Sequence, residues 1–200
     1  MDREDARAHT RPDERLMQAL VEGDLTGLAE LYRRHMANVH ALCYRLTGSA
    51  EAADDMVQET FLRVVRHRAS FRGQARFTTW LYRIARNVCI DHLQSSQRRR
   101  RARERYRVVT GNAGHVQAPE PPEDVRALAR ALARLSHEKR EALVLSRYYD
   151  LSHTEIADIV GCSVGAVKVR VHRALKDLRG MVEVMERESD EVSGERRAHP

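Results

Sequence analysis

Residues 151–173 read LSHTEIADIVGCSVGAVKVRVHR, and this stretch predicts a helix-turn-helix. Ser152 can cap a first short helix, because Glu155, three residues later, completes a capping box. Gly161 then ends this helix, and Ser163 is the expected N-cap of a second one. Apolar residues recur at helical spacing in both helices and are expected to face inward. The stretch therefore predicts two helices joined by a tight turn that contains glycine.

The outer face of the second helix is basic. Its residues are Lys168, Val169, His172, Arg173 and Lys176. A helix that enters the major groove of DNA needs such a face, because the flanking phosphates are anionic. The pattern therefore indicates a DNA-binding helix. From this stretch alone, a three-helix bundle with a solvated basic face is the alternative interpretation.

Composition limits the class of protein. The 200 residues carry a formal net charge of +6, are rich in Ala, Leu, Arg and Glu, and show little strand-like alternation, which predicts an all-α fold. The positive charge favours a polyanionic partner, although acidic protein or membrane headgroups also fit. Apolar runs are too short to span a membrane, and the polar start is unlike a signal peptide. We therefore expect a cytoplasmic protein without membrane insertion, and three widely spaced cysteines agree with a reducing compartment.

The chain is predicted to form two small helical domains joined by a flexible linker. A four-helix domain is expected over residues 13–104 and a helix-turn-helix domain over residues 123–182. Residues 105–122 mix Gly, Asn and Pro without periodicity, which is typical of a linker. The charged tails, residues 1–12 and 183–200, are expected to be disordered.

Apolar residues at helical spacing define the four helices of the first domain. The helices are expected from Asp13 to Glu22, from about Leu25 to Leu46, from an N-cap at Ser49 to Arg68, and from a cap at Thr78 or Thr79 through the arginine-rich segment. The apolar stripe of the second helix is expected to face inward. It consists of Leu28, Leu31, Tyr32, Val39, Leu42, Cys43 and Leu46.

The other face of the third helix is polar and begins with acidic residues. It carries Asp54, Asp55, Gln58, Glu59, Leu62 and Arg63. An acidic first turn suits the helix dipole, so a capped and solvated helix accounts for most of this face. Leu62 within it hints at a protein contact.

The loop before the fourth helix, ASFRGQARFTT (69–79), combines phenylalanines, arginines and a glycine. Such side chains can stack on unpaired bases and neutralise their phosphates. Phe71 and Phe77 could equally pin the loop to the core. The helix that follows shows a polar ladder of Arg83, Asn87 and Asp91, residue types that include hydrogen-bond partners of base edges. It ends in an arginine run, typical of a phosphate-contacting or mobile arm rather than of folded core, and the candidate phosphate contacts in it are Arg98, Arg99, Arg100 and Arg101.

Three motifs carry a family resemblance. They are DDMVQETFLRV (54–64), FRGQARFTTWLYRIARNVCIDHL (71–93) and LSHTEIADIVGCSVGAVKVRVHRAL (151–175). In this order across a linker, the chain resembles the extracytoplasmic-function (ECF) sigma factors of bacterial RNA polymerase from about Asp13 to Arg179. The resemblance implies a promoter-recognition subunit that binds the β′ clamp helices and the β flap of core polymerase. It also implies recognition of −35 and −10 promoter DNA, melting of the −10 element and an anti-sigma partner.

The resemblance assigns roles to the residues already singled out. The docking helix for polymerase would present Asp54, Asp55, Gln58, Glu59, Leu62 and Arg63. The −10 DNA would contact Phe71, Arg72, Gln74 and Phe77 in the loop, and Trp80, Arg83, Asn87 and Asp91 on the helix. The −35 DNA would contact Ser163, Lys168, Val169, His172, Arg173 and Lys176. Asp91 fits a DNA-contacting role poorly, because a carboxylate repels phosphate and accepts well only from a cytosine amino group.

Two other classes of protein fit parts of the sequence. A helix-turn-helix regulator that acts without replacing a sigma factor fits the second domain but leaves the first hundred residues unexplained. Two i, i+3 pairs, His40 with Cys43 and Cys89 with His92, make a zinc site conceivable. Both cysteines fall near apolar stripes, where cysteine is usually a small hydrophobe, so no metal and no cofactor are expected. No Walker-type loop or nucleophile elbow is present, so no enzyme is expected.

Overall fold

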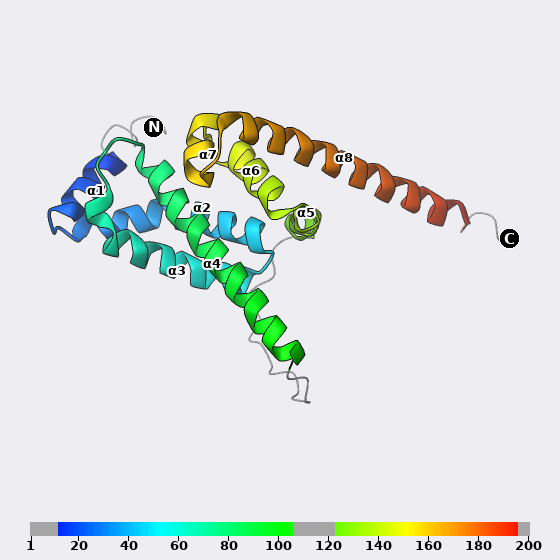
Figure 1. Ribbon diagram of the computed structural model, residues 1–200, viewed down its shortest axis with the longest axis horizontal. Helices are drawn as coiled ribbons and strands as arrows, with labels where there is room; N and C mark the ends of the chain where they lie inside the picture. The colour runs from blue at the N-terminus through cyan, green and yellow to red at the C-terminus, as the bar shows by residue number, and fades with distance from the viewer. Residues whose placement is uncertain (1–11, 106–122, 196–200) are drawn as a thin grey trace, which may run out of the picture. The chain divides into compact units, whose positions relative to one another are not determined.

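The computed structural model describes residues 12–105 and 123–195, and every regular element in these ranges is a helix (Figure 1). The chain divides into two compact units, residues 1–120 and 121–200. The prediction of an all-α protein with two helical domains is therefore confirmed. Nearly all of the predicted linker, 106–122, and most of the predicted first tail, 1–11, lie outside the described residues.

Within residues 12–105, the first unit contains four α-helices and one turn of 3₁₀-helix. They are α1 (Asp13–Val21), α2 (Thr26–Thr47), α3 (Ala50–Arg66), η1 (Arg68–Ser70) and α4 (Phe77–Arg105). Helix α2 packs against α1, α3 and α4, and α3 also packs against α4. The core between them is apolar, with Met17, Leu31, Leu42, Met56 and Leu81 fully buried.

Helix α1 lies close against α2 because Gly27 has no side chain. A Cβ atom built at Gly27 would lie 2.9 Å from the backbone oxygen of Leu16, a separation that real Cβ atoms essentially never show. Any other residue at position 27 would therefore push α1 away from α2.

A polar cluster fixes the start of α1 on α2. Asp13 Oδ1 accepts a hydrogen bond from Arg34 Nη1 at 2.7 Å, and His35 Nε2 lies 2.6 Å from Asp13 Oδ2. Burial by itself raises the pKa of Asp13, but the hydrogen bonds from His35 and Arg34, together with their charges, outweigh burial and hold this pKa below its usual value. The ionised carboxylate is thus the form that stabilises the folded domain.

We expect Asp13→Asn to lower the free energy of unfolding of the first unit by about 1–2 kcal/mol at neutral pH. The folded-state pKa is depressed, so this contribution is present above the pKa of the unfolded chain, about 3.9, and is lost as pH falls through the folded-state pKa. The chain has a single tryptophan, Trp80, so urea unfolding followed by its fluorescence reports on this unit. The exposed Asp55→Asn is the matched control. An equal loss in both variants would contradict the assignment.

An aromatic cluster joins the loop after η1 to the start of α4. Phe71 and Phe77 are buried, and the Trp80 ring lies 5.5 Å from Phe71 and 6.2 Å from Phe77 between centroids. The prediction that Thr78 or Thr79 caps this helix is wrong, because α4 begins at Phe77. The first backbone N–H of the helix, that of Phe77, donates to Glu14 Oε1 on α1 at 3.1 Å. A carboxylate distant in sequence thus takes the place of a local cap.

The second unit contains α5 (Glu123–Ala133), α6 (His137–Tyr148), α7 (His153–Val160) and α8 (Val164–Glu195). Helix α8 packs against α5, α6 and α7. It continues to Glu195, past the predicted end of the second domain at residue 182, while 196–200 lie outside the described residues. Met, Glu and Arg are good helix formers, and glycine does not appear again until Gly194, so local propensity favours this extension.

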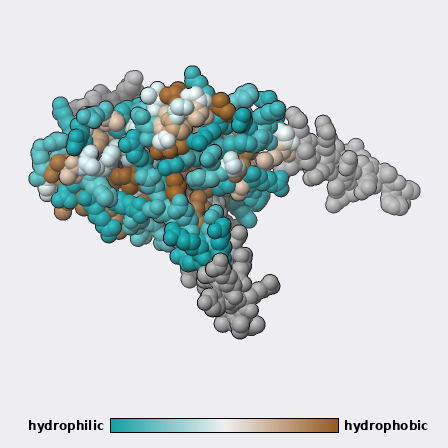
Figure 2. All heavy atoms as spheres, viewed as in Figure 1, coloured by the Kyte–Doolittle hydropathy of each residue, from teal (hydrophilic) through white to brown (hydrophobic). Residues whose placement is uncertain are grey.

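Across residues 12–105 and 123–195, no helix combines the length and the apolar character that a membrane span requires. On the face drawn in Figure 2, most of the described surface is hydrophilic.

Candidate docking and DNA-binding surfaces

The face of α3 predicted to dock a protein is exposed. Asp54, Asp55, Gln58 and Leu62 are exposed, and Glu59 and Arg63 are half-buried. Leu62 leaves 51% of its surface accessible, although the opposite side of the helix is buried in the core. Ser49 caps the helix as predicted, since its hydroxyl accepts from the Ala52 N–H at 3.2 Å. The face thus has the exposure that docking requires, and its partner stays a prediction.

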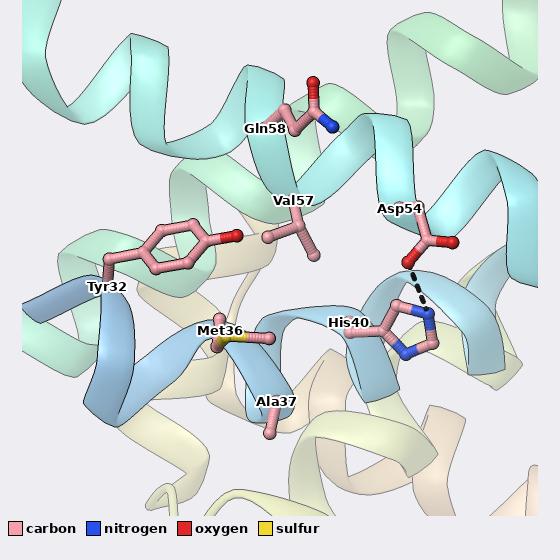
Figure 3. Close-up of a pocket in the computed structure, with 7 residues that line it drawn as sticks. All are labelled: Tyr32, Met36, Ala37, His40, Asp54, Val57 and Gln58. Atoms are coloured by element: carbon pink, nitrogen blue, oxygen red, sulfur yellow. Dashed lines mark ion pairs between the residues drawn. The ribbon is translucent and has the colours of Figure 1, made fainter. Parts of the chain in front are cut away.

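A hollow of about 560 Å³ extends this face onto α2 (Figure 3). It is lined by Tyr32, Met36, Ala37 and His40 from α2 and by Asp54, Val57 and Gln58 from α3. Tyr32 was predicted to face inward, but it is exposed, and its ring packs edge-on against Phe61 at 4.8 Å. At one end of the hollow, His40 Nε2 lies 3.3 Å from Asp54 Oδ1.

The sequence interpretation missed the contribution of α2 to this surface. Met36 is 40% exposed, and its apolar side chain beside the hollow offers a contact that polar residues on α3 alone would not. Tyr32 lies at the edge of an apolar stripe, where helical periodicity does not separate a core side chain from one at the rim. The candidate docking surface therefore comprises both helices.

The loop before α4 separates into buried and exposed residues. Phe71 is 8% exposed and Phe77 is fully buried. In this structure both rings therefore pin this segment to the core, which was the alternative to stacking on bases. Arg72 and Gln74 are exposed, and Gly73 between them has φ +68°, a left-handed conformation that glycine adopts without strain. A base-binding pocket at this loop stays a prediction. Of its four predicted residues, Arg72 and Gln74 are accessible to a DNA base in this structure.

The polar ladder of α4 faces solvent. Arg83, Asn87 and Asp91 are exposed on successive turns of one face, and Trp80, one turn before Arg83, is half-buried. Farther along the same helix, Arg98, Arg99 and Arg101 are exposed, and Arg100 belongs to the same helical segment. One continuous helix thus carries the predicted −10 ladder and the predicted phosphate contacts.

Asp91, the residue that fitted the ladder least well, has a partner on α3. Arg63 Nη1 donates to Asp91 Oδ2 at 2.8 Å, and Arg63 Nε donates to Glu59 Oε1 at 2.7 Å. These two hydrogen bonds raise the pKa of Arg63 above its ordinary value. The carboxylate of Asp91 is therefore paired with a guanidinium.

The helix-turn-helix is confirmed, with α7 and α8 as its two helices. Ser152 Oγ accepts from the Glu155 N–H at 3.2 Å, and Glu155 Oε2 accepts from the Ser152 N–H at 2.9 Å, which completes the capping box. Gly161 ends α7 in the left-handed conformation at φ +76°. Ser163 Oγ accepts from the Ala166 N–H at 3.1 Å and so caps α8. Sequence and structure agree because each of these bonds is local.

We expect Ser152→Ala to destabilise α7 by about 1 kcal/mol, because the Glu155 N–H loses its side-chain acceptor. Amide hydrogen exchange should show faster exchange in the first turn of α7 than in the unchanged protein. Thr154→Ala, which alters an exposed residue of the same helix, is the matched control. Unchanged exchange in Ser152→Ala would show that the capping box contributes nothing to this helix.

The predicted −35 residues form one exposed face of α8. Lys168, Val169, His172, Arg173 and Lys176 are exposed, as is Ser163 at the start of the helix. The Ser163 oxygen accepts from the Ala166 N–H, and its hydroxyl proton stays available for donation. Arg170 and Asp177 contact α6 instead, through Glu138 at 3.5 Å and Lys139 at 2.7 Å. These pairs orient the basic face away from the core of its unit.

The residues of the conceivable zinc site do not form one. Cys43 and Cys89 are fully buried, and His40 faces Asp54. Across residues 12–105 and 123–195, no three His, Cys, Asp or Glu side chains come together as a metal site would require. None of the three cysteines forms a disulfide bond.

The fold defines a class: a helical protein of two units, one with a helix-turn-helix and the other with an exposed surface on α2 and α3. Residues 31–99 match the Sigma-70 region 2 family, and residues 125–178 match the Sigma-70 region 4 family. The ECF RNA polymerase sigma factor SigL of Mycobacterium tuberculosis is 37% identical over 158 residues, which cover 74% of this chain and 85% of that protein.

Two further proteins show the same relationship. The ECF RNA polymerase sigma factor SigE of Mycolicibacterium smegmatis is 36% identical over 158 residues, covering 75% of this chain but 59% of that protein, so less than two thirds of SigE is matched. Sigma factor RpoE of Bartonella quintana, solved in complex with the anti-sigma factor NepR, matches with a TM-score of 0.62 and 26% identity. That match covers 78% of this chain and 96% of the RpoE chain. The present chain belongs to the extracytoplasmic-function sigma factors of bacterial RNA polymerase.

Proposed function

We propose that this protein is an alternative sigma factor that binds core RNA polymerase, recognises −35 and −10 promoter elements and melts the −10 DNA. One observation carries the proposal: two candidate DNA-binding faces occur on two separate helical units, and one unit also presents the α2–α3 docking surface. A simple helix-turn-helix regulator needs only the second unit. In this proposal, residues 13–104 bind core polymerase and the −10 element, and residues 123–182 bind the −35 element.

Each of the two units would bind one promoter element. Exposed Lys168 and Arg173 on α8 would contact the −35 element in the major groove. Lys168 is a point donor rather than a bidentate fork, so its preference for guanine is softer than that of an arginine. Exposed Arg72, Gln74 and Asn87 of the first unit would contact the unpaired −10 strand, with Trp80 and the buried phenylalanines as the apolar wall beside it.

Opening of DNA by this protein requires no covalent chemistry, so the proposed function is not enzymatic. Unstacking costs a few kcal/mol per base. Stacking a base on protein recovers about 1–3 kcal/mol, so a single pocket nearly balances a single flipped base. The remainder must come from polymerase contacts, and the isolated factor should bind promoter DNA poorly.

An anti-sigma factor is the second proposed partner, acting in the cytoplasm. The structural relative RpoE was solved with its anti-sigma factor NepR, which supports a regulator of this kind for the present chain. The exposed apolar side chains of Tyr32, Met36 and Leu62 give such a regulator a surface shared with polymerase. Binding of one partner would then exclude the other.

Run-off transcription tests the proposed function. Purified core polymerase is mixed with the full chain and genomic DNA fragments, and the 5′ ends of the transcripts are mapped. We expect transcripts that depend on this protein and whose start sites share upstream elements. If the protein instead binds a palindromic operator as a dimer and adds no transcript to core polymerase, the helix-turn-helix regulator is the correct class.

A further inference from the structure

The candidate −10 face of α4 contains an acidic residue at its centre. Asp91 is the sole carboxylate between Phe77 and Arg103, in a helix otherwise rich in arginine. Its side chain is 59% exposed, so a DNA strand lying along the ladder would meet it. An unpaired carboxylate at that place would repel the phosphates that the arginines attract.

The neighbouring helix supplies the compensating charge. Arg63 reaches Asp91 from α3 at 2.8 Å and is held from its other side by Glu59 at 2.7 Å. Arg66, a second arginine of α3, lies 3.9 Å from the Glu59 carboxylate. The hydrogen bonds to Glu59 and Asp91 therefore hold the Arg63 guanidinium between α3, the candidate docking helix, and the candidate −10 face of α4.

We propose that Arg63 is a positioning residue for promoter DNA, which neutralises Asp91 and fixes its carboxylate on the α4 ladder. The inference rests on the proposed function. Arg63 and Asp91 are 27% and 59% exposed, and ion pairs this accessible contribute little to folding. The effect of the pair is therefore on the binding of an anion to this face rather than on stability. Arg63 also belongs to the candidate docking set, so the docking helix and the promoter face share this side chain.

The experiment uses the holoenzyme formed from core polymerase and full-length protein. The probe is the fluorescently labelled single-stranded non-template DNA of the promoter mapped by run-off transcription. Core affinity of each variant is measured first, and DNA binding is then measured at core concentrations that saturate each variant. The variants are Arg63→Gln, Asp91→Asn, the double variant and Arg66→Gln, which removes one positive charge from the same helix without the Asp91 contact.

We expect Arg63→Gln to weaken DNA binding roughly fivefold at low salt, and less at high salt, because screening shields the uncovered carboxylate. Asp91→Asn in the Arg63→Gln background should restore binding to within about twofold, since the uncompensated charge is gone. Arg66→Gln should change binding by less than about twofold. A purely structural role for Arg63 would not be rescued by removing Asp91.

Three results would overturn the inference: no rescue in the double variant, equal losses in Arg63→Gln and Arg66→Gln, or a loss in Asp91→Asn alone as large as in Arg63→Gln. The last would mean that Asp91 itself reads a base. Failure of the proposed function is a distinct outcome, because the unchanged holoenzyme would then make no protein-dependent transcript from which to take the probe.

Discussion

Leu62→Asp is expected to weaken binding to core polymerase by about a hundredfold. Leu62 is 51% exposed within a polar helix face, and in the proposed complex with polymerase its apolar side chain would be buried. The substitution removes that apolar contact and places a carboxylate where water is excluded, which together cost about 3 kcal/mol. Because the side chain is exposed in the free protein, unfolding should change by less than about 0.5 kcal/mol.

The structure offers a matched control for this experiment. Leu25 is 61% exposed and lies just before α2, so it belongs neither to the polar face of α3 that carries Leu62 nor to the lining of the α2–α3 hollow. Leu25→Asp makes the same chemical change at a similar exposure and should leave core binding within about twofold. Fluorescence anisotropy of labelled protein titrated with core polymerase measures both. Equal losses at the two positions would refute a specific docking role for Leu62.

Joint replacement of Lys168 and Arg173 by glutamine should weaken binding of the holoenzyme to a duplex containing the mapped −35 element by about a hundredfold. Each contact to a base edge or phosphate contributes about 1–3 kcal/mol. The two losses at separate positions should add approximately. If both side chains also displace counterions, the slope of log affinity against log salt should become shallower by roughly 2.

The control keeps the change in net charge but moves it to other elements of the same unit. Arg134 and Arg147 are exposed outside α8, and their joint replacement by glutamine also removes two positive charges. Duplex binding should then fall by no more than about threefold, through the long-range field alone. A comparable loss in both double variants would mean that overall charge, rather than the α8 face, governs −35 binding.

Local rules made the second unit largely predictable. The capping box at Ser152, the left-handed Gly161 and the Ser163 cap each involve residues within a few positions of one another. Apolar periodicity similarly indicated the buried sides of α2, α3 and α8. Where the determinants of a feature are near each other in sequence, the prediction and the structure agree.

Features set by tertiary contacts were not predictable. The start of α4 depends on Glu14, sixty-three positions away from Phe77, so Thr78 and Thr79 were better local candidates than the true cap. The outward position of Tyr32 follows from the α2–α3 packing and not from its place in the stripe. The pairing of Asp91 likewise required knowledge that α3 and α4 lie side by side.

Helix α4 runs without interruption from Phe77 to Arg105, and this continuity fixes a distance. At about 1.5 Å per residue, Arg83 and Arg101 are separated by roughly 27 Å along the helix axis. One added residue between them would lengthen that separation slightly but rotate one end against the other by about 100°. A single helix therefore sets both the distance and the relative rotation of the predicted −10 ladder and the predicted phosphate contacts. Inserting one residue between them should impair DNA binding far more than a single substitution there.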